Sequence, residues 1–133
     1  MKNLLLIFLL SLTLYSCSSN GKPPTPPYDL KYSFHTEKNY QYVYRLILNN
    51  ADSCSKQGVA SKMISEGQLY SDIKSGDITM SLHAPFGKYT HLRIKIETNN
   101  GKTNVAVSNE FERWDELAKV IKDWVINETS FCR

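Results

Sequence analysis

The chain has 133 residues, a formal net charge of +3, and 41% hydrophobic and 22% charged residues. These proportions are typical of a small folded protein and exclude a low-complexity or disordered chain. The small positive charge gives no reason to expect a nucleic acid partner.

Residues 1–16 have the pattern of a secretory signal peptide. Lys2 supplies a positive start, and the apolar run from Leu4 to Tyr15 is interrupted only by Ser11 and Thr13. Such a charged start followed by a short apolar region is typical of export signals. The alternative is an uncleaved signal anchor, but a membrane-spanning helix needs about 20 apolar residues. We therefore expect an exported chain from which residues 1–16 are removed.

Leu14-Tyr15-Ser16-Cys17 resembles the lipobox of bacterial lipoproteins. In that motif an aliphatic residue and two usually small residues precede a cysteine that is diacylated and becomes the first residue. Leu14, Ser16 and Cys17 match, whereas Tyr15 is bulkier than the usual residue. The resemblance implies lipid attachment at Cys17 and a membrane partner reached through that lipid. By the sorting rule of enteric bacteria, Ser18 after the cysteine favours the outer membrane, with the domain facing the periplasm.

Residues 17–27 have the composition of a linker between the lipid site and a folded domain. Four of the chain's five prolines lie in this segment. Proline-rich segments favour an extended spacer of about 3.1 Å per residue. The alternative is a ligand for an SH3-like partner domain. Residues 28–133 are then expected to form a single globular domain.

The first part of the domain is predicted to be β. Leu30–Phe34 and Tyr40–Leu48 read as strands, with the turn at residues 36–38. Residues 52–66 stay open between a short helix and irregular structure, because Gly58 weakens the helical pattern. The tyrosines of the second strand suit cross-strand packing or, alternatively, a partner-binding surface. These candidate residues are Tyr40, Tyr42 and Tyr44.

The strongest strand pattern is the segment HLRIKIE, in which apolar and polar side chains alternate. This alternation predicts a half-buried antiparallel strand. Asn100-Gly101 is a strong signal for a two-residue hairpin turn. That turn sets Ile96 opposite Val105 and Ile94 opposite Val107, which places all four side chains on one face.

A second hairpin is predicted before the first. Residues 78–82 alternate in the same way, and a Ser75-Gly76 turn would join them to residues 69–74. Ile73 would then lie opposite Ile78. Together the two hairpins predict a meander of four antiparallel strands.

The C-terminal segment has a helical period of roughly five turns. Asn109 and Glu112 have the spacing of a capping box. The apolar stripe is expected to cover the sheet, although it also suits binding in a partner's groove. The predicted fold class is therefore α+β, an antiparallel β-meander with a long C-terminal amphipathic helix packed on one face. The stripe consists of Phe111, Trp114, Leu117, Ala118, Ile121, Trp124 and Val125.

Cys54 and Cys132 remain an even pair once Cys17 is assigned to lipid. An oxidising compartment favours a disulfide between them. The alternative, a metal site, lacks further His or Cys ligands at suitable spacing. We therefore predict a disulfide and no metal.

His83 and His91 are predicted to face each other on the outer side of the sheet. With Arg93 and Lys95 they would form a basic patch suited to a protein partner. Two alternatives stay open: a pair of metal ligands, for which no third ligand is evident, and an ordinary solvated strand face.

The sequence contains no catalytic motif such as Gly-x-Ser-x-Gly, a phosphate loop or His-Glu-x-x-His. We therefore expect a non-enzymatic protein without a cofactor that binds another envelope protein, as an accessory or pilot subunit of a secretion, conjugation or pilus system. The alternative is an immunity or inhibitor lipoprotein that neutralises an exported toxin or hydrolase. A third possibility, a small hydrolase or ligand-binding protein, would need a cleft with convergent polar groups.

Overall fold

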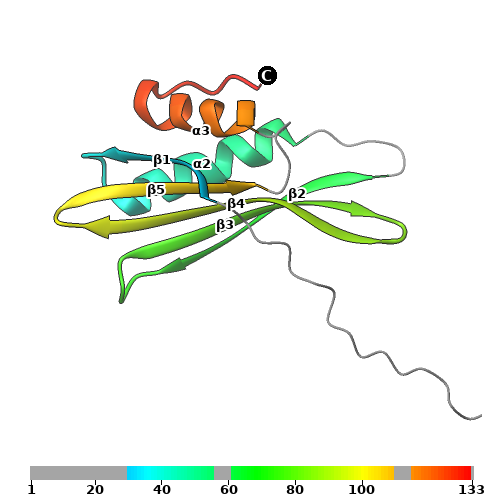
Figure 1. The fold of residues 1–133 in the computed structure, drawn as a ribbon, viewed down its shortest axis with the longest axis horizontal. Helices are drawn as coiled ribbons and strands as arrows, with labels where there is room; N and C mark the ends of the chain where they lie inside the picture. Colours follow the sequence, from blue (N-terminus) through cyan, green and yellow to red (C-terminus); the bar gives the residue numbers. More distant parts are fainter. Residues whose placement is uncertain (1–29, 56–60, 110–114, 133) are drawn as a thin grey trace, which may run out of the picture.

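A computed structural model describes residues 30–55, 61–109 and 115–132 (Figure 1). Residues 1–29 lie outside the described part, and with them the signal segment, Cys17 and the linker. Residues 110–114, which include Trp114 and most of the expected capping box, also lie outside it.

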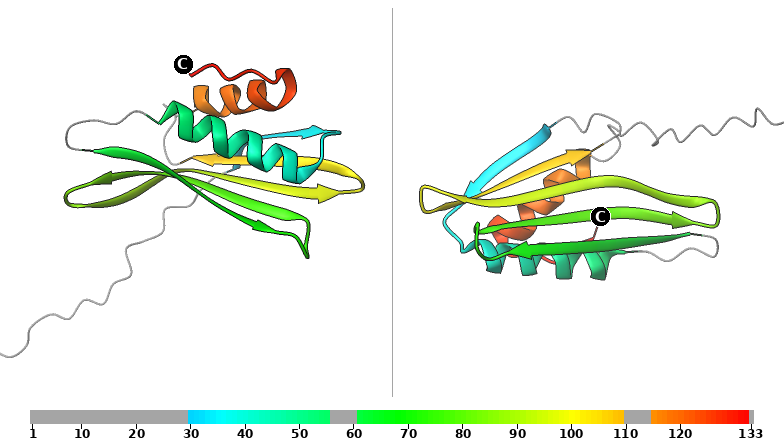
Figure 2. Two further views of the ribbon diagram at one scale, coloured as in Figure 1. Left: turned by 180° about the vertical axis from the view of Figure 1, so that it is seen from behind. Right: turned by 90° about the horizontal axis from the view of Figure 1, so that it is seen from below.

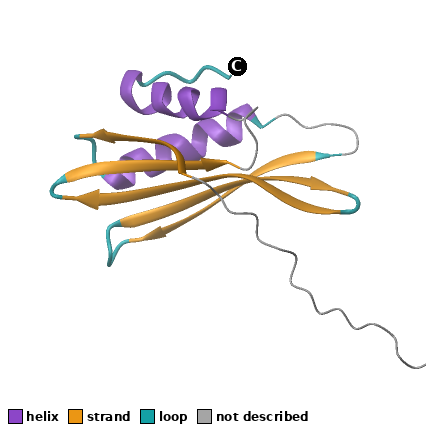
Figure 3. Cartoon of the chain, viewed as in Figure 1, coloured by secondary structure: helices purple, strands orange, loops and turns teal. Residues whose placement is uncertain are grey.

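One antiparallel sheet and two helices make up the described fold. The sheet has five strands in the order β1-β5-β4-β3-β2. Both helices lie on the same side of it (Figures 2 and 3). The strands are β1 (Leu30–Thr36), β2 (Lys62–Tyr70), β3 (Ser75–Ala84), β4 (Gly87–Asn99) and β5 (Lys102–Asn109), and the helices are α2 (Tyr40–Cys54) and α3 (Asp115–Asn127).

The predicted fold class is wrong. The described residues are mostly β, with a five-stranded sheet and two short helices, and no long C-terminal helix covers the sheet. α3 has 13 residues and ends at Asn127, because Glu128 adopts a positive φ of 53° that stops the helix. The cover of the sheet is shared between α3 and a helix that was predicted to be a strand.

That helix, α2, replaces the predicted strand at Tyr40–Leu48. Asn39 caps it, because its side chain accepts a hydrogen bond of 2.8 Å from the backbone N–H of Gln41. Tyrosines at every second position gave the strand pattern, but the buried positions recur at helical spacing. They are Tyr40, Val43, Tyr44, Ile47, Asn50 and Ala51.

The β4–β5 hairpin is confirmed in its predicted register. Ile96 pairs with Val105 and Ile94 pairs with Val107. Asn100 and Gly101 have φ values of 51° and 78°. Positive φ at both central residues is what a two-residue type I′ turn requires, and these two residue types adopt it readily.

The predicted turn at Ser75-Gly76 is wrong, and so is the pairing of Ile73 with Ile78. Ser75 and Gly76 lie inside β3, paired with Tyr70 and Leu69. The turn occupies residues 71–74 instead, where Lys74 has a φ of 49°. Ile73 is therefore a turn residue with 67% of its surface exposed.

Gly76 is needed for packing against a neighbouring side chain and not for a turn. A Cβ atom at this position would lie 2.8 Å from Cδ2 of Tyr44. A Cβ at Gly67, on the neighbouring strand β2, would also collide with the Tyr44 ring. The two glycines thus let the buried Tyr44 of α2 lie close against the sheet.

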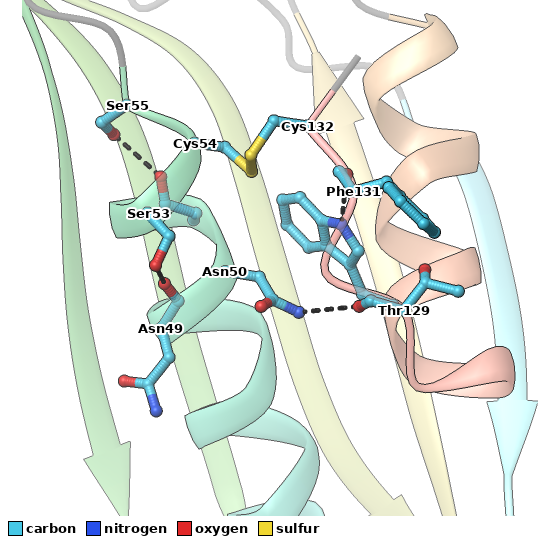
Figure 4. Close-up of a disulfide and its surroundings, with 10 residues drawn as sticks. Asn49, Asn50, Ser53, Cys54, Ser55, Thr129, Phe131 and Cys132 are labelled. Atoms are coloured by element: carbon cyan, nitrogen blue, oxygen red, sulfur yellow. Dashed lines mark hydrogen bonds between the residues drawn. A yellow bond between two sulfur atoms is a disulfide. The ribbon is translucent and has the colours of Figure 1, made fainter.

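A disulfide joins the end of α2 to the C-terminal tail (Figure 4). The Cα atoms of Cys54 and Cys132 lie 5.3 Å apart. Two hydrogen bonds hold the same tail: Asn50 donates to the carbonyl of Thr129 (3.2 Å), and the indole N–H of Trp124 donates to the carbonyl of Phe131 (3.0 Å). The tail is therefore fastened to both helices at the edge of the core.

Candidate interaction surface

The three candidate tyrosines do not form an exposed aromatic strand. Tyr40 and Tyr44 are buried in the core, with 7% and 8% of their surfaces exposed. Burial raises the pKa of the Tyr44 hydroxyl. Only Tyr42 is exposed, and its hydroxyl donates a hydrogen bond to Glu128 (3.2 Å). The predicted tyrosine surface is wrong because α2 turns two of these rings into the core.

The structure does not bring His83 and His91 opposite each other. The β3–β4 register shifts between Met80 and Ser81, so that His83 pairs with Lys88. His91 falls in this irregularity and is 6% exposed. A pairing of His83 with His91 requires Leu82 to lie opposite Leu92. Leu92 pairs with Met80 instead, so the true register already differs from the predicted one by two residues before the irregularity.

Arg93 and Lys95 do share one surface, on the side of the sheet away from the helices. They alternate along β4 with Ile94 and Ile96, which are buried on the helix side of the sheet. The exposed side chains of Arg93 and Lys95 therefore lie on the opposite face. No described residue outside the sheet covers this side (Figure 2). We call it the open face, made of Ser33, His35, Glu66, Gln68, Asp77, Thr79, Arg93, Lys95, Glu97, Asn104, Ala106 and Ser108.

The open face carries both signs of charge and is not the basic patch that the sequence suggested. Lys95 forms an ion pair with Glu97 (2.6 Å), which raises the pKa of Lys95. Asp77 pairs with Lys95 across the strands and adds to that effect. Lys88 donates a hydrogen bond to Glu66 and so lowers the pKa of the Glu66 carboxyl. The cations therefore lie among carboxylates, a pattern that favours a partner with its own mixed charges.

A metal centre finds no support in residues 30–55, 61–109 and 115–132. Within these ranges no group of three or more His, Cys, Asp or Glu side chains is arranged to hold a metal ion. Within the same ranges no helix has both the length and the apolar content needed to cross a bilayer.

The exposed tip of the β3–β4 hairpin was not predicted from the sequence. Phe86 in its turn is 95% exposed, and Tyr89 at the start of β4 is 52% exposed. The available signal was an aromatic residue inside a short Pro-Phe-Gly turn, between two strands of clear alternation. Hydrophobic periodicity alone does not show that such a turn projects from the fold.

Comparisons with known proteins assign no family. No family model matches the sequence, and no curated protein is similar to it. A solution structure of cyanobacterial PsbP (CyanoP) from Synechocystis is similar at 14% sequence identity and a TM-score of 0.24. The match covers 68% of this chain and 61% of that one, so the chain spans about three-fifths of its length. A likeness of this degree assigns no function.

Proposed function

We propose that the chain is a lipid-anchored protein of the bacterial envelope, most of it facing the periplasm, that binds another protein without catalysing a reaction. The signal-like start and the lipobox-like segment ending at Cys17 support the anchor. The open face supports protein binding. The partner class that fits an anchored accessory domain is a component of an envelope machine.

The observation that carries the proposal is a full sheet face that no described helix covers, since α2 and α3 both lie on the other side. Five strands spaced about 4.8 Å apart, with about eight residues of 3.4 Å each, give a surface of roughly 25 Å by 27 Å. A standard protein interface buries about 800 Å² on each partner. The planar area of the open face, about 675 Å² from these spacings, is therefore close to one side of such an interface.

The helical layer is the poorer candidate. The stripe of α3 that suited a partner's groove is occupied within the protein: Ile121, Trp124 and Val125 have 0% of their surfaces exposed. Ala118 is buried with them at 1%. These side chains already cover the sheet and are not available to a partner.

The anchor is tested by the Cys17→Ser variant. We expect this variant to move from the membrane fraction to the soluble fraction, because it loses the only thiol to which the lipid would be attached. Fractionation followed by immunoblotting measures the change, and intact mass of the wild-type protein checks for the acyl chains. A Cys17→Ser variant that stays entirely in the membrane would contradict the anchor.

The binding surface is tested by removing its two central cations. The Arg93→Ala/Lys95→Ala variant should lower partner binding by about tenfold, because each exposed charge contributes up to about 1 kcal/mol. The matched control removes two cations from the helical layer, Arg45→Ala/Lys122→Ala. It should leave binding unchanged.

Photo-crosslinking identifies the partner for that measurement. A photoreactive residue at Gln68 on the open face should crosslink one protein, whereas the same residue at Arg45 should not. A partner belonging to an envelope machine supports the proposal. An exported toxin or hydrolase would identify the chain as an immunity or inhibitor protein, and equal crosslinking at both positions would contradict the open face as the binding surface.

A further inference from the structure

The β3–β4 hairpin extends past the end of β5 as an arm (Figure 1). The last pair between β4 and β5 is Leu92 with Asn109. Residues 87–91 of β4 therefore lie beyond β5, a length of about 17 Å at 3.4 Å per residue. β2 follows the arm on its other side, where Lys62 pairs with His83. The arm is thus a supported three-stranded projection.

The tip of the arm combines exposed aromatic rings with cations. Phe86 exposes 95% of its surface, the largest exposed fraction among the large hydrophobic residues that the structure describes. Tyr89 is 52% exposed. Lys62 on β2 and Lys88 on β4 pair with His83 from its two sides and are both exposed, and Lys88 also forms an ion pair with Glu66. Aromatic rings flanked by lysines are the side chains favoured at the boundary between lipid headgroups and acyl chains.

The arm lies at the same end of the sheet as the start of β1. β1 and β4 both run antiparallel to β5, so β1 begins at the end where β4 begins. The chain therefore enters the described fold at that end, at Leu30. Only twelve residues separate Cys17 from Leu30. A chain of that length spans at most about 45 Å, so an anchor on Cys17 would limit the distance between this end of the sheet and the bilayer to about that length.

We propose that the arm tip is a second membrane contact, in which Phe86 enters the headgroup region while Lys88 and Lys62 lie near lipid phosphates. The inference rests on the proposed anchor at Cys17. A four-residue tip is too small for a standard protein interface, which needs about 800 Å² from each partner. A bilayer needs no such area, because the anchor already supplies a high effective concentration for a weak contact. The two contacts together fix how the open face is presented to the periplasm.

Tryptophan fluorescence in vesicles tests the contact with the full-length protein. The Phe86→Trp variant and the wild type are purified with their native N-terminal modification and reconstituted into vesicles of phosphatidylethanolamine and phosphatidylglycerol. Bromine atoms on the upper acyl chain quench nearby indoles. The added emission of Phe86→Trp should fall by about half, because interfacial side chains lie ~5–10 Å deep, close to these bromines.

Ile73→Trp is the matched control. Ile73 is 67% exposed in the β2–β3 turn, which lies at the opposite end of β3 from the tip. Its emission should not change with brominated lipid. Equal quenching of the two variants, or no quenching of Phe86→Trp, would overturn the proposal.

The mass of the N-terminal peptide from the same samples separates this inference from the proposed anchor. Acylated Cys17 with an unquenched Phe86→Trp variant overturns the tip contact and leaves the anchor standing. Unmodified Cys17 with a quenched Phe86→Trp variant supports the tip contact and contradicts the anchor. Loss of a protein crosslink on Phe86→Ala, without quenching of Phe86→Trp, would assign the tip to a protein partner and overturn the membrane contact.

Discussion

Replacing Trp124 with alanine is expected to lower the free energy of unfolding by about 3–5 kcal/mol, the range found for large aromatic residues in protein cores. Trp124 has no exposed surface and lies in α3, next to the equally buried Val125. Its loss would leave a cavity between α3, α2 and the sheet that these rigid elements would fill only in part. Urea denaturation followed by circular dichroism measures the change.

Two further variants separate the parts of this effect. Trp124→Phe keeps most of the ring but loses the indole hydrogen bond to the carbonyl of Phe131, and it should cost about 1 kcal/mol plus a small packing term. Phe131→Ala is the surface control, because this side chain is 74% exposed. It should change the stability by less than about 0.5 kcal/mol. A Trp124→Ala variant as stable as the control would contradict the core position of α3.

The hairpin of β4 and β5 was predictable because its signals are local. Alternation fixed the face of each strand, and Asn100-Gly101 fixed the turn type and with it the register. No such local signal places β1 beside β5, since β1 ends at Thr36 and β5 begins only at Lys102. β1 was recognised as a strand, but its pairing with β5 was not predicted.

α2 was missed because two periods compete in the same segment. Tyr40, Tyr42 and Tyr44 alternate as in a strand, while Val43 and Ile47 continue a helical stripe. The N-cap side chain of Asn39 favours the helix, and this signal was overlooked. Gly76 also has two possible readings, since a glycine can mark a turn or a close packing contact. The turn was predicted, whereas the structure has the contact, in which the Tyr44 ring packs against Gly76.

The candidate surface was predicted only in part, for a related reason. Arg93 and Lys95 were placed correctly because strand parity is a local property. The pairing of His83 with His91 failed because Leu92 lies opposite Met80, two residues from the predicted register, and the irregularity after Met80 shifts the later pairs by one more. The mixed charge of the face also depends on β2, whose Glu66 receives a hydrogen bond from Lys88 across the sheet, and no sequence spacing reveals that contact.

Replacing both Cys54 and Cys132 with serine is expected to lower the free energy of unfolding by about 2–5 kcal/mol. The two cysteines are 78 residues apart, so their link closes a long loop and restricts the unfolded chain strongly. The chain-entropy model gives about 4.5 kcal/mol for a loop of that length. Denaturation of the double variant and the wild type, with and without a reducing agent, measures the effect.

The reducing agent provides the control for that comparison. Reduction should destabilise the wild type to the level of the double variant and leave the double variant unchanged. Mass mapping without reduction should yield one peptide pair joined through Cys54 and Cys132, and two free thiols would contradict the disulfide. The bond should also couple to Trp124, because the tail it fastens carries the Phe131 carbonyl that accepts the indole hydrogen bond. Combining the cysteine variant with Trp124→Phe should therefore cost less than the sum of the two changes, since residues that share one packed segment do not contribute independently.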